Sequence, residues 1–204
     1  MRRLLVALAA VAAVAAGCAD PGAGLVPAPG EARIDVDTPE LRQLKRQAGV
    51  EPCRRGDGEP VEGGLPEVTL PCFGGGRDVD LSTLRGPMVV NLWASWCGPC
   101  RREMPILQDF HERHGDRVAV LGIDHNDPQT TRAMQLVLDT GVTYPLLADP
   151  QTELSAAAPF PVLRGLPFWA FVDEQGRVVH QEFLEVESRD ELEALVEEHL
   201  EVTL

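Results

Sequence analysis

The chain of 204 residues contains very little lysine, and Lys45 is the only one. Its 32 Asp and Glu residues outnumber its 18 Lys and Arg residues, which gives a formal net charge of −14 at pH 7. Nucleic-acid binding needs basic side chains that neutralise phosphates, so we expect no nucleic-acid partner. The same acidity opposes binding to acidic lipid headgroups. Any membrane attachment would therefore depend on a lipid anchor.

Metal-binding motifs of the zinc-finger kind are also missing. The chain has one Cys-x-x-Cys, at Cys97 and Cys100, but no second copy and no histidine pair at finger spacing. A structural zinc ion needs four ligands, so this motif does not indicate such a site. For His111, His114 and His125 the sequence shows no cysteine or carboxylate placed to complete a site, and we expect them to be solvated or to lie in loops. We predict neither a metal nor a cofactor.

The apolar run near the N-terminus is too short to cross a membrane. Met1-Arg2-Arg3 is basic and residues 4–16 are apolar, which is typical of a signal peptide. The run ends in Ala15-Ala16-Gly17-Cys18, which resembles a bacterial lipobox except that Ala15 stands where leucine is usual. We expect residues 1–18 to be a signal peptide and Cys18 to carry a lipid that anchors the protein to the bacterial cell membrane. The alternative is an ordinary signal peptide, with Cys18 free or removed and the protein secreted.

Export determines how the other cysteines are counted. Without Cys18, four of the five cysteines remain, and an even number in an oxidising compartment favours two disulfides. We expect these to be Cys97–Cys100 and Cys53–Cys72. We interpret the second as a structural staple that joins the short helix region to the first strand, worth roughly 3 kcal/mol for a loop of about 20 residues. The alternative is a second redox pair that relays electrons to Cys97.

Composition divides the chain into three parts, which are residues 1–18, 19–64 and 65–204. Residues 19–64 begin with a segment rich in Pro, Gly and Ala, followed by a short helix that Thr38 can cap and Gly49 can end. We expect a tether and a short helix there, and a folded domain over residues 65–204. Expected strands lie at residues 68–70, 79–81, 88–94, 118–123, 144–148, 168–172 and 177–183, and expected helices at 98–113, 127–140, 149–157 and 188–200. Strands that alternate with helices predict an α/β fold with a central sheet.

The motif Trp96-Cys97-Gly98-Pro99-Cys100 stands between an apolar strand and a helix. Unpaired N–H groups and the dipole at a helix N-terminus favour a thiolate at Cys97. Cys100 lies one turn further on and close enough to form a disulfide. The carboxyl edge of a central strand is also where α/β folds place their chemistry. A Cys-x-x-Cys in this position indicates redox use.

Four motifs resemble those of one family. They are Trp93-Ala94-Ser95-Trp96-Cys97-Gly98-Pro99-Cys100, Arg101-Arg102-Glu103-Met104-Pro105, Arg164-Gly165-Leu166-Pro167, and Asp80-Leu81-Ser82-Thr83-Leu84-Arg85-Gly86. Together they cover about residues 65–200, and they are similar to the exported TlpA/ResA-like thiol-disulfide oxidoreductases of the thioredoxin-fold superfamily. The resemblance implies a thioredoxin-like α/β fold, with a central mixed sheet flanked by helices and an added N-terminal β-hairpin.

The resemblance also implies roles for single residues of the motif. Cys97 would be the attacking cysteine and Cys100 the resolving one, which agrees with their places on the helix. Trp96, Gly98 and Pro99 would surround the cysteines and tune their redox potential. Pro99 resembles the family residue that restrains the turn.

A second segment would face the client. Pro167 matches the family's cis-proline, which packs against the disulfide, since a non-proline residue would adopt cis only at a cost of about 2.5–4 kcal/mol. Leu166 would then offer its backbone to an incoming peptide. The alternative for Pro167 is an ordinary turn proline.

The chain departs from thioredoxin at one position near the cysteines. Thioredoxin has a buried aspartate six residues before the first cysteine, and this chain has Asn91 there, which cannot titrate. The ResA-like branch has a glutamate three residues after the second cysteine, which corresponds to Glu103. Helical spacing places residue 103 near the face of Cys100. We therefore expect Glu103 to accept the Cys100 proton, and the alternative is a surface glutamate.

These motifs lead to a leading hypothesis and two alternatives. The resemblance implies a reductase for disulfides of extracytoplasmic client proteins, as in cytochrome c biogenesis, with an antioxidant role. It would be recharged by a membrane thiol transporter of the CcdA/DsbD kind. The first alternative is a thiol oxidase that introduces disulfides. The second is a lipoprotein that uses the fold only for binding, against which the intact Cys97 and Cys100 pair argues.

Overall fold

The computed structural model describes residues 33–204, which form one compact unit from Arg33 to Leu204. Residues 1–32 lie outside the described part of the chain. The signal peptide, the first part of the tether and the lipidation of Cys18 therefore stay predictions. Within residues 33–204, no helix has both the length and the apolar character needed to span a membrane.

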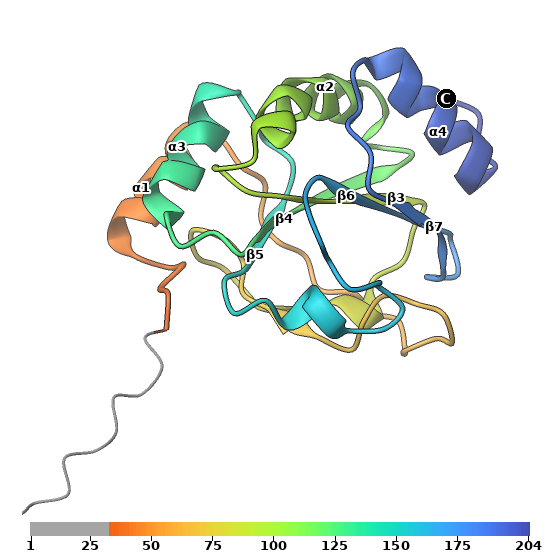
Figure 1. Cartoon of the computed structure of the whole chain (residues 1–204), viewed down its shortest axis with the longest axis horizontal. Coiled ribbons are helices and arrows are strands. Elements are labelled where there is room, and N and C mark those ends of the chain that lie inside the picture. The colour runs from red at the N-terminus through yellow and green to blue at the C-terminus, as the bar shows by residue number, and fades with distance from the viewer. Residues whose placement is uncertain (1–32) are drawn as a thin grey trace, which may run out of the picture. The chain divides into compact units, whose positions relative to one another are not determined.

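A five-stranded sheet lies at the centre of this unit (Figure 1). In spatial order its strands are β5 (Leu146–Asp149), β4 (Ala119–His125), β3 (Met88–Trp93), β6 (Phe168–Val172) and β7 (Val178–Glu182). The pairs β5–β4 and β4–β3 are parallel, whereas β3–β6 and β6–β7 are antiparallel. The predicted central mixed sheet is therefore confirmed, and β3 is its middle strand.

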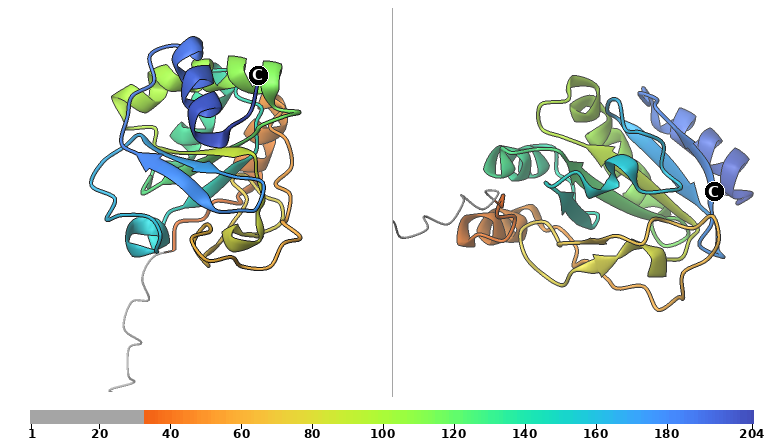
Figure 2. Two further views of the ribbon diagram at one scale, coloured as in Figure 1. Left: turned by 90° about the vertical axis from the view of Figure 1, so that its right-hand side faces the viewer. Right: turned by 60° about the horizontal axis from the view of Figure 1, so that its bottom comes forward.

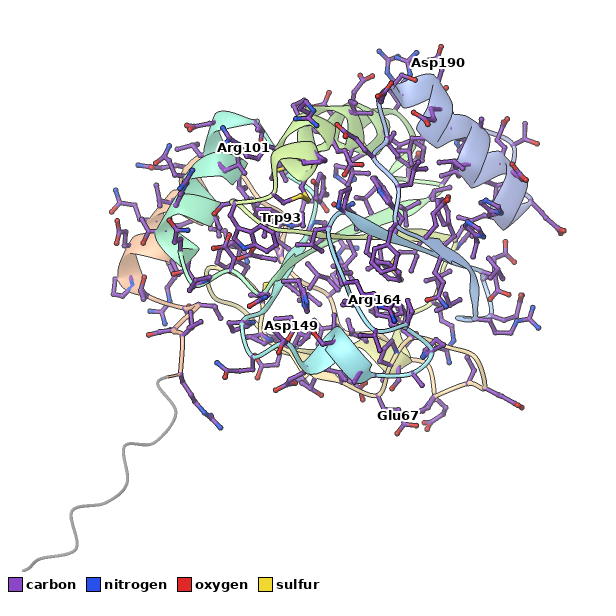
Figure 3. All side chains as sticks on the ribbon, viewed as in Figure 1. Glu67, Trp93, Arg101, Asp149, Arg164 and Asp190 are labelled. Atoms are coloured by element: carbon purple, nitrogen blue, oxygen red, sulfur yellow. A yellow bond between two sulfur atoms is a disulfide. The ribbon has the colours of Figure 1, made fainter. Side chains whose placement is uncertain are left out.

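The middle strand is buried along its whole length, because both faces of the sheet are covered. Val89 and Trp93 belong to one core cluster, and Val90 and Leu92 belong to the other. Side chains alternate between the two faces of a strand, so a strand covered on both sides needs a continuous apolar run. Figure 3 shows Trp93 in the interior, at the end of the strand from which the Cys-x-x-Cys motif follows.

Four helices lie on one side of the sheet, with α1 packed beside α3 at the β5 edge (Figures 1 and 2). They are α1 (Pro39–Ala48), α2 (Gly98–His114), α3 (Thr130–Asp139) and α4 (Arg189–Leu200). The helices lie in two neighbouring pairs, α1 with α3 and α2 with α4. Both cysteines of the motif belong to the core cluster on this face.

The other face is covered by the predicted N-terminal hairpin and by a short helix. The hairpin consists of β1 (Thr69–Leu70) and β2 (Val79–Asp80), which pair antiparallel, and the 3₁₀ helix η1 (Leu81–Thr83) follows. A second 3₁₀ helix, η2 (Glu153–Ala156), stands where the sequence predicts a short helix at residues 149–157. These elements bury their apolar side chains in the second core cluster.

The folded unit begins earlier than the expected boundary at residue 65. Thr38 caps α1 by accepting a 3.2 Å hydrogen bond from the Leu41 N–H, and Gly49 ends it with φ +75°, as predicted. Leu41, however, is completely buried in the core beside α3. Cys53 is also nearly buried and bonded to Cys72. Residues 33–64, which the sequence assigned to the end of the tether, the short helix and the Cys53 loop, are therefore packed onto the domain.

Candidate active site

The site begins where β3 ends. Residues 94–97 leave the sheet, and the Cys97 N–H donates a 3.1 Å hydrogen bond to the Ala94 carbonyl, which closes a tight turn into α2. Cys97 is the N-cap residue of α2, and Gly98 and Pro99 form its first turn. Proline suits this position because the first N–H groups of a helix have no partner within the helix. The turn thus places both cysteines at the predicted helix N-terminus.

Cys97 and Cys100 form a disulfide with their sulfur atoms 1.97 Å apart. Cys97 Sγ also accepts a 3.2 Å hydrogen bond from the Cys100 N–H. The exposed fraction is 4% for Cys97 and 1% for Cys100, so the first cysteine is the more accessible, as expected. Since the cap sulfur already accepts a helix N–H, a thiolate at Cys97 would be stabilised by the same donor and by the helix dipole.

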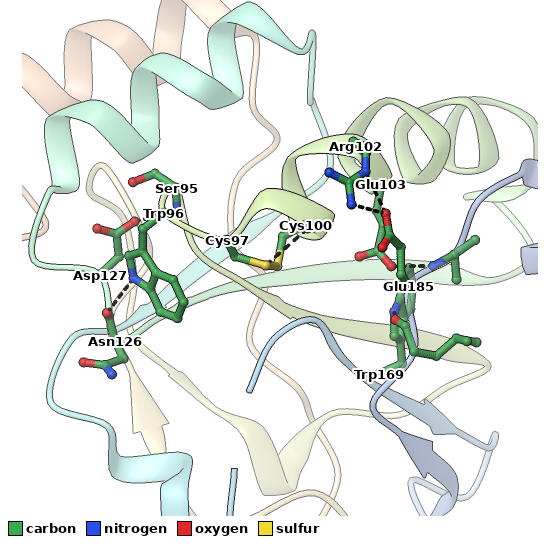
Figure 4. Close-up of a disulfide and its surroundings, with 12 residues drawn as sticks. Ser95, Trp96, Cys97, Cys100, Arg102, Glu103, Asn126, Asp127, Trp169 and Glu185 are labelled. Atoms are coloured by element: carbon green, nitrogen blue, oxygen red, sulfur yellow. Dashed lines mark hydrogen bonds and ion pairs between the residues drawn. A yellow bond between two sulfur atoms is a disulfide. The ribbon is translucent and has the colours of Figure 1, made fainter. Parts of the chain in front are cut away.

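The turn before the cysteines is fixed by hydrogen bonds to the segment after β4 (Figure 4). The Ser95 N–H donates a 2.6 Å hydrogen bond to Asp127 Oδ2, and Trp96 Nε1 donates a 3.1 Å hydrogen bond to the Asn126 carbonyl. The Trp96 ring is still 49% exposed, which is unusual for such a large apolar side chain. Trp96 thus presents a rigid apolar surface beside the disulfide.

Glu103 lies in the interior of α2 and is only 1% exposed, so it is not a surface glutamate. Its Oε1 accepts a 2.6 Å hydrogen bond from the Val186 N–H, whereas Oε2 has no hydrogen-bond partner within residues 33–204. Burial raises the pKa of Glu103 to about 8, an effect that the Val186 N–H and the side chains of Trp169 and Asn91 partly oppose. The carboxyl group is therefore mostly protonated at pH 7.

The predicted client-facing segment enters β6 directly. The Leu166–Pro167 peptide bond is cis, as expected. Pro167 is buried, and Leu166 is half-buried against the cluster that contains both active-site cysteines. The segment therefore packs against the same core cluster as the disulfide.

A surface cleft of about 680 Å³ adjoins the turn at Ser95. Its walls come from the start of α2 and from α3, with Arg101 and Arg132 as its basic side chains and Asp139 as its acidic one. Figure 3 shows Arg101 on the outside of α2. In a chain with a net charge of −14, this is a locally basic surface beside the site.

Sequence reasoning missed a buried polar group at the carboxyl ends of β4 and β5. His125 Nδ1 lies 2.7 Å from Asp149 Oδ2, and His125 is only 5% exposed, so the expectation of a solvated histidine is wrong. Asp124 is buried nearby and faces Asp127 and Asp149, and burial with these neighbouring charges raises the pKa of Asp124 well above its usual range. Charged residues at the ends of two consecutive apolar strands were the available signal, because parallel strands meet at one edge.

The other predicted solvated histidines are also paired. His111 Nε2 lies 3.1 Å from Glu51, and His114 Nε2 lies 2.9 Å from Glu193. Both acidic partners are distant in sequence, so no local pattern predicted these contacts.

One further cluster contains the kinds of atoms that bind metals. Donor atoms of His180 and Glu182 on β7 and of His199 on α4 all lie within 4.8 Å of one another. Imidazole and carboxylate donors suit ions such as zinc. Strand β6 separates β7 from the strand that leads to the disulfide, so this cluster is not part of the same site.

The sequence of the chain is similar to those of known redox proteins. Residues 60–196 match the model of the Redoxin family. Thioredoxin from Alicyclobacillus acidocaldarius is 51% identical over 47 residues, a match that covers 22% of this chain and 44% of that protein. The thiol-disulfide oxidoreductase ResA from Halalkalibacterium halodurans is 27% identical over 129 residues, which covers 62% of this chain and 68% of that protein. The chain thus spans less than half the length of that thioredoxin.

A solved structure with the same fold is a secreted thiol-disulfide isomerase from Corynebacterium glutamicum. It superposes with a TM-score of 0.57 at 29% identity, over 65% of this chain and 85% of that one. The thioredoxin-like fold expected from the sequence is therefore confirmed. Because the matched segment 60–196 contains the sheet, the disulfide and the cis-proline, the chain belongs to the Redoxin family.

Proposed function

We propose that the protein is an extracytoplasmic thiol-disulfide oxidoreductase that reduces disulfides of client proteins. The observation that carries the proposal is the Cys97–Cys100 disulfide at the N-terminus of α2, with Cys97 Sγ accepting the Cys100 N–H. This geometry stabilises the thiolate form of the more exposed cysteine. The names of ResA and of the secreted isomerase support the same activity, and the second name also supports the location.

The reaction consists of two exchanges of sulfur partners. Cys97, as the thiolate, attacks one sulfur of the client disulfide, so a Cys97–client bond forms and the other client sulfur leaves as a thiolate. Cys100 then loses its proton and attacks Cys97 Sγ, which forms Cys97–Cys100 and releases the second client thiolate. The client gains two electrons and the protein loses two. Trp96 and the backbone of Leu166 flank the client during these steps.

In its ionised form, which is the minor form at pH 7, Glu103 supplies the base for the second exchange. It lies three residues after Cys100 on the same helix, one turn away. A carboxyl group with a pKa of about 8 has nearly the proton affinity of a thiol, whose usual pKa is about 8.5. Transfer of the Cys100 proton to Glu103 is therefore close to balanced, which is the favourable condition for a general base.

A thiol assay tests the activity. Insulin reduction by dithiothreitol should be accelerated by the wild-type protein and not by the Cys97→Ala variant. The Cys100→Ser variant should accumulate a mixed disulfide with the client through Cys97, because the resolving thiol is missing. Equal rates for wild type and Cys97→Ala would overturn the proposed activity.

The direction of the reaction depends on the reduction potential. Gly98 and Pro99 between the cysteines favour the reductase direction, in the manner of thioredoxin, with clients such as cytochrome c precursors and recharging by a membrane thiol transporter of the CcdA/DsbD kind. A measured reduction potential of about −270 mV would support this direction, whereas a value of about −120 mV would support the oxidase alternative. A lipid-modified Cys18, found by mass spectrometry of the membrane fraction, would establish the proposed anchor.

A further inference from the structure

The only lysine of the chain is buried against the second disulfide. Lys45 lies in α1 and is 8% exposed. Its Nζ is 2.9 Å from Cys72 Sγ and 2.8 Å from the Gly75 carbonyl oxygen. A buried lysine usually has an acidic partner, so a sulfur atom in that place needs an explanation.

The charge of Lys45 is poorly compensated in the disulfide form. Within residues 33–204 no carboxylate lies within ion-pair distance of the Lys45 ammonium group. The carboxylate of Asp37 raises the pKa of Lys45 from a longer distance, but it is already paired with Arg42. Burial lowers the pKa of Lys45. A buried cation beside a neutral disulfide is unfavourable, whereas the same cation beside a thiolate forms a compensated pair.

The other sulfur also has a partner that suits the reduced state. Cys53 Sγ lies 3.1 Å from the Leu146 carbonyl oxygen. A disulfide sulfur has no hydrogen to donate, whereas a Cys53 thiol would donate to this carbonyl. After reduction, one sulfur would therefore be a hydrogen-bonded thiol and the other a thiolate paired with Lys45.

The two sulfurs differ in access. Cys53 is 9% exposed and lines a cavity of about 690 Å³, whereas Cys72 is 2% exposed. Charged and titratable side chains that line the cavity on this side are Glu51, Arg54, Arg85, His111, Glu112 and Asp116. An incoming thiol therefore reaches Cys53, which makes Cys72 the leaving group.

We propose that Cys53–Cys72 is a second redox site, in which an external thiol attacks Cys53 and Cys72 leaves as a thiolate held by Lys45. This goes beyond the proposed activity of Cys97–Cys100. The two disulfides belong to core clusters on opposite faces of the sheet. The site therefore exchanges with a thiol from solution rather than with Cys97.

Electrons and protons balance over two steps. A thiolate RS⁻ attacks Cys53 Sγ, so an RS–Cys53 bond forms, the Cys53–Cys72 bond breaks and Cys72 takes the electron pair. A second thiolate attacks the RS sulfur and releases the disulfide RSSR and the Cys53 thiolate. Cys53 then binds one proton and, as a thiol, donates a hydrogen bond to the Leu146 carbonyl. The thiol is oxidised and the protein gains two electrons.

The test uses the chain with Cys97→Ser and Cys100→Ser, so that only the second pair titrates. Alkylation and mass spectrometry measure how far dithiothreitol reduces Cys53–Cys72 in this chain. The same measurement is made with Lys45→Met, Lys45→Arg or Arg46→Met added. Lys45→Met should make the equilibrium constant for reduction about tenfold less favourable. This corresponds to a reduction potential about 30 mV more negative. Lys45→Arg should retain most of the wild-type reduction potential. Arg46→Met, an exposed change on the same helix, should have no effect.

Two measurements on the chain with Lys45 intact do not depend on the folding of a lysine variant. With a small thiol in limiting amounts, the mixed disulfide should map to Cys53, and after reduction Cys72 should alkylate with an apparent pKa well below that of a free thiol. An adduct at Cys72, an ordinary Cys72 pKa or an unchanged potential in Lys45→Met would overturn the proposal. Loss of the folded near-ultraviolet signal on reduction would overturn it in favour of a structural staple.

Discussion

Glu103 receives a hydrogen bond from the backbone of Val186 on one oxygen and from no group within residues 33–204 on the other. This carboxyl group connects the active-site helix to the segment that precedes α4. A single strong donor holds the side chain in place, and the free oxygen keeps the cost of ionisation high. The contact leaves one oxygen of this buried carboxyl group available to bind a proton.

Replacing Glu103 by glutamine should slow resolution of the mixed disulfide. Glutamine retains the shape and can still accept from Val186, but it cannot bind the Cys100 proton. General-base catalysis is typically worth about 10²-fold or more, and we expect at least about a tenfold slower second step. Stopped-flow release of a labelled client should show it, with a pH profile that no longer bends near pH 8.

The control for this variant is Glu112→Gln, on the same helix but exposed. Its kinetics and pH profile should match those of wild type. If Glu103→Gln resolves the mixed disulfide at the wild-type rate with the same pH profile, Glu103 is not the proton acceptor and has a structural role only.

Glu103 should also make stability depend on pH. Its pKa is raised from an ordinary value near 4.5 to about 8 in the folded state, so the folded protein keeps a proton that the unfolded chain loses in this window. Stability should therefore fall as pH rises from about 5 to 8, by at most about 1.4 kcal/mol per pH unit. Urea unfolding of wild type and Glu103→Gln at both pH values isolates this effect. A difference between the two proteins that is the same at pH 5 and pH 8 would contradict it.

The parts of the site that sequence could predict are those that local patterns encode. A strand, a helix start and two cysteines three positions apart determine one another's geometry. Thr38 and Gly49 bound α1 for equally local reasons. The cis bond at Pro167 followed from a motif in the same way. Glu103 was predicted either as a proton acceptor near Cys100 or as a surface glutamate, and its burial was not predicted, since helical spacing does not reveal what covers a helix face.

The parts that sequence could not predict depend on contacts between distant segments. Lys45 meets Cys72 across 27 positions, and His125 meets Asp149 across 24. Residues 33–64 carry few apolar side chains, so their composition did not predict that they belong to the folded domain. Leu41 and Cys53 nevertheless find partners on the domain, and tertiary packing outweighed local composition.

Gly122 should be intolerant of a side chain. It lies in β4 opposite Asn91 of β3, and an added Cβ would come within 2.6 Å of Leu146, 3.0 Å of Tyr144 and 3.2 Å of Trp93. All three neighbours are fully buried, so Gly122→Ala should destabilise the fold by about 1–3 kcal/mol through overpacking. Gly165→Ala, where a Cβ would have open space, should stay within about 0.5 kcal/mol of wild type. Thermal or urea unfolding measures both, and equal stabilities would contradict the argument.

Asp127 should determine the rigidity of the turn that carries the cysteines. Its carboxylate is 1% exposed and accepts hydrogen bonds from the N–H of Ser95 at 2.6 Å and from that of Gln129 at 2.9 Å. Asparagine has only one acceptor atom, so Asp127→Asn leaves one buried N–H facing another donor, at a cost of about 1–3 kcal/mol.

We expect Asp127→Asn to loosen the turn locally as well as to lower the free energy of unfolding. With its bond from Ser95 weakened, the turn should protect the Ser95 and Trp96 amides less from hydrogen exchange, and Trp96 fluorescence should report a more mobile ring. Asp139→Asn is the matched control, because Asp139 is exposed and accepts from Gln135 on its own helix. A variant at Asp127 with wild-type stability and unchanged exchange at Ser95 would show that the turn is held by the disulfide and α2 alone.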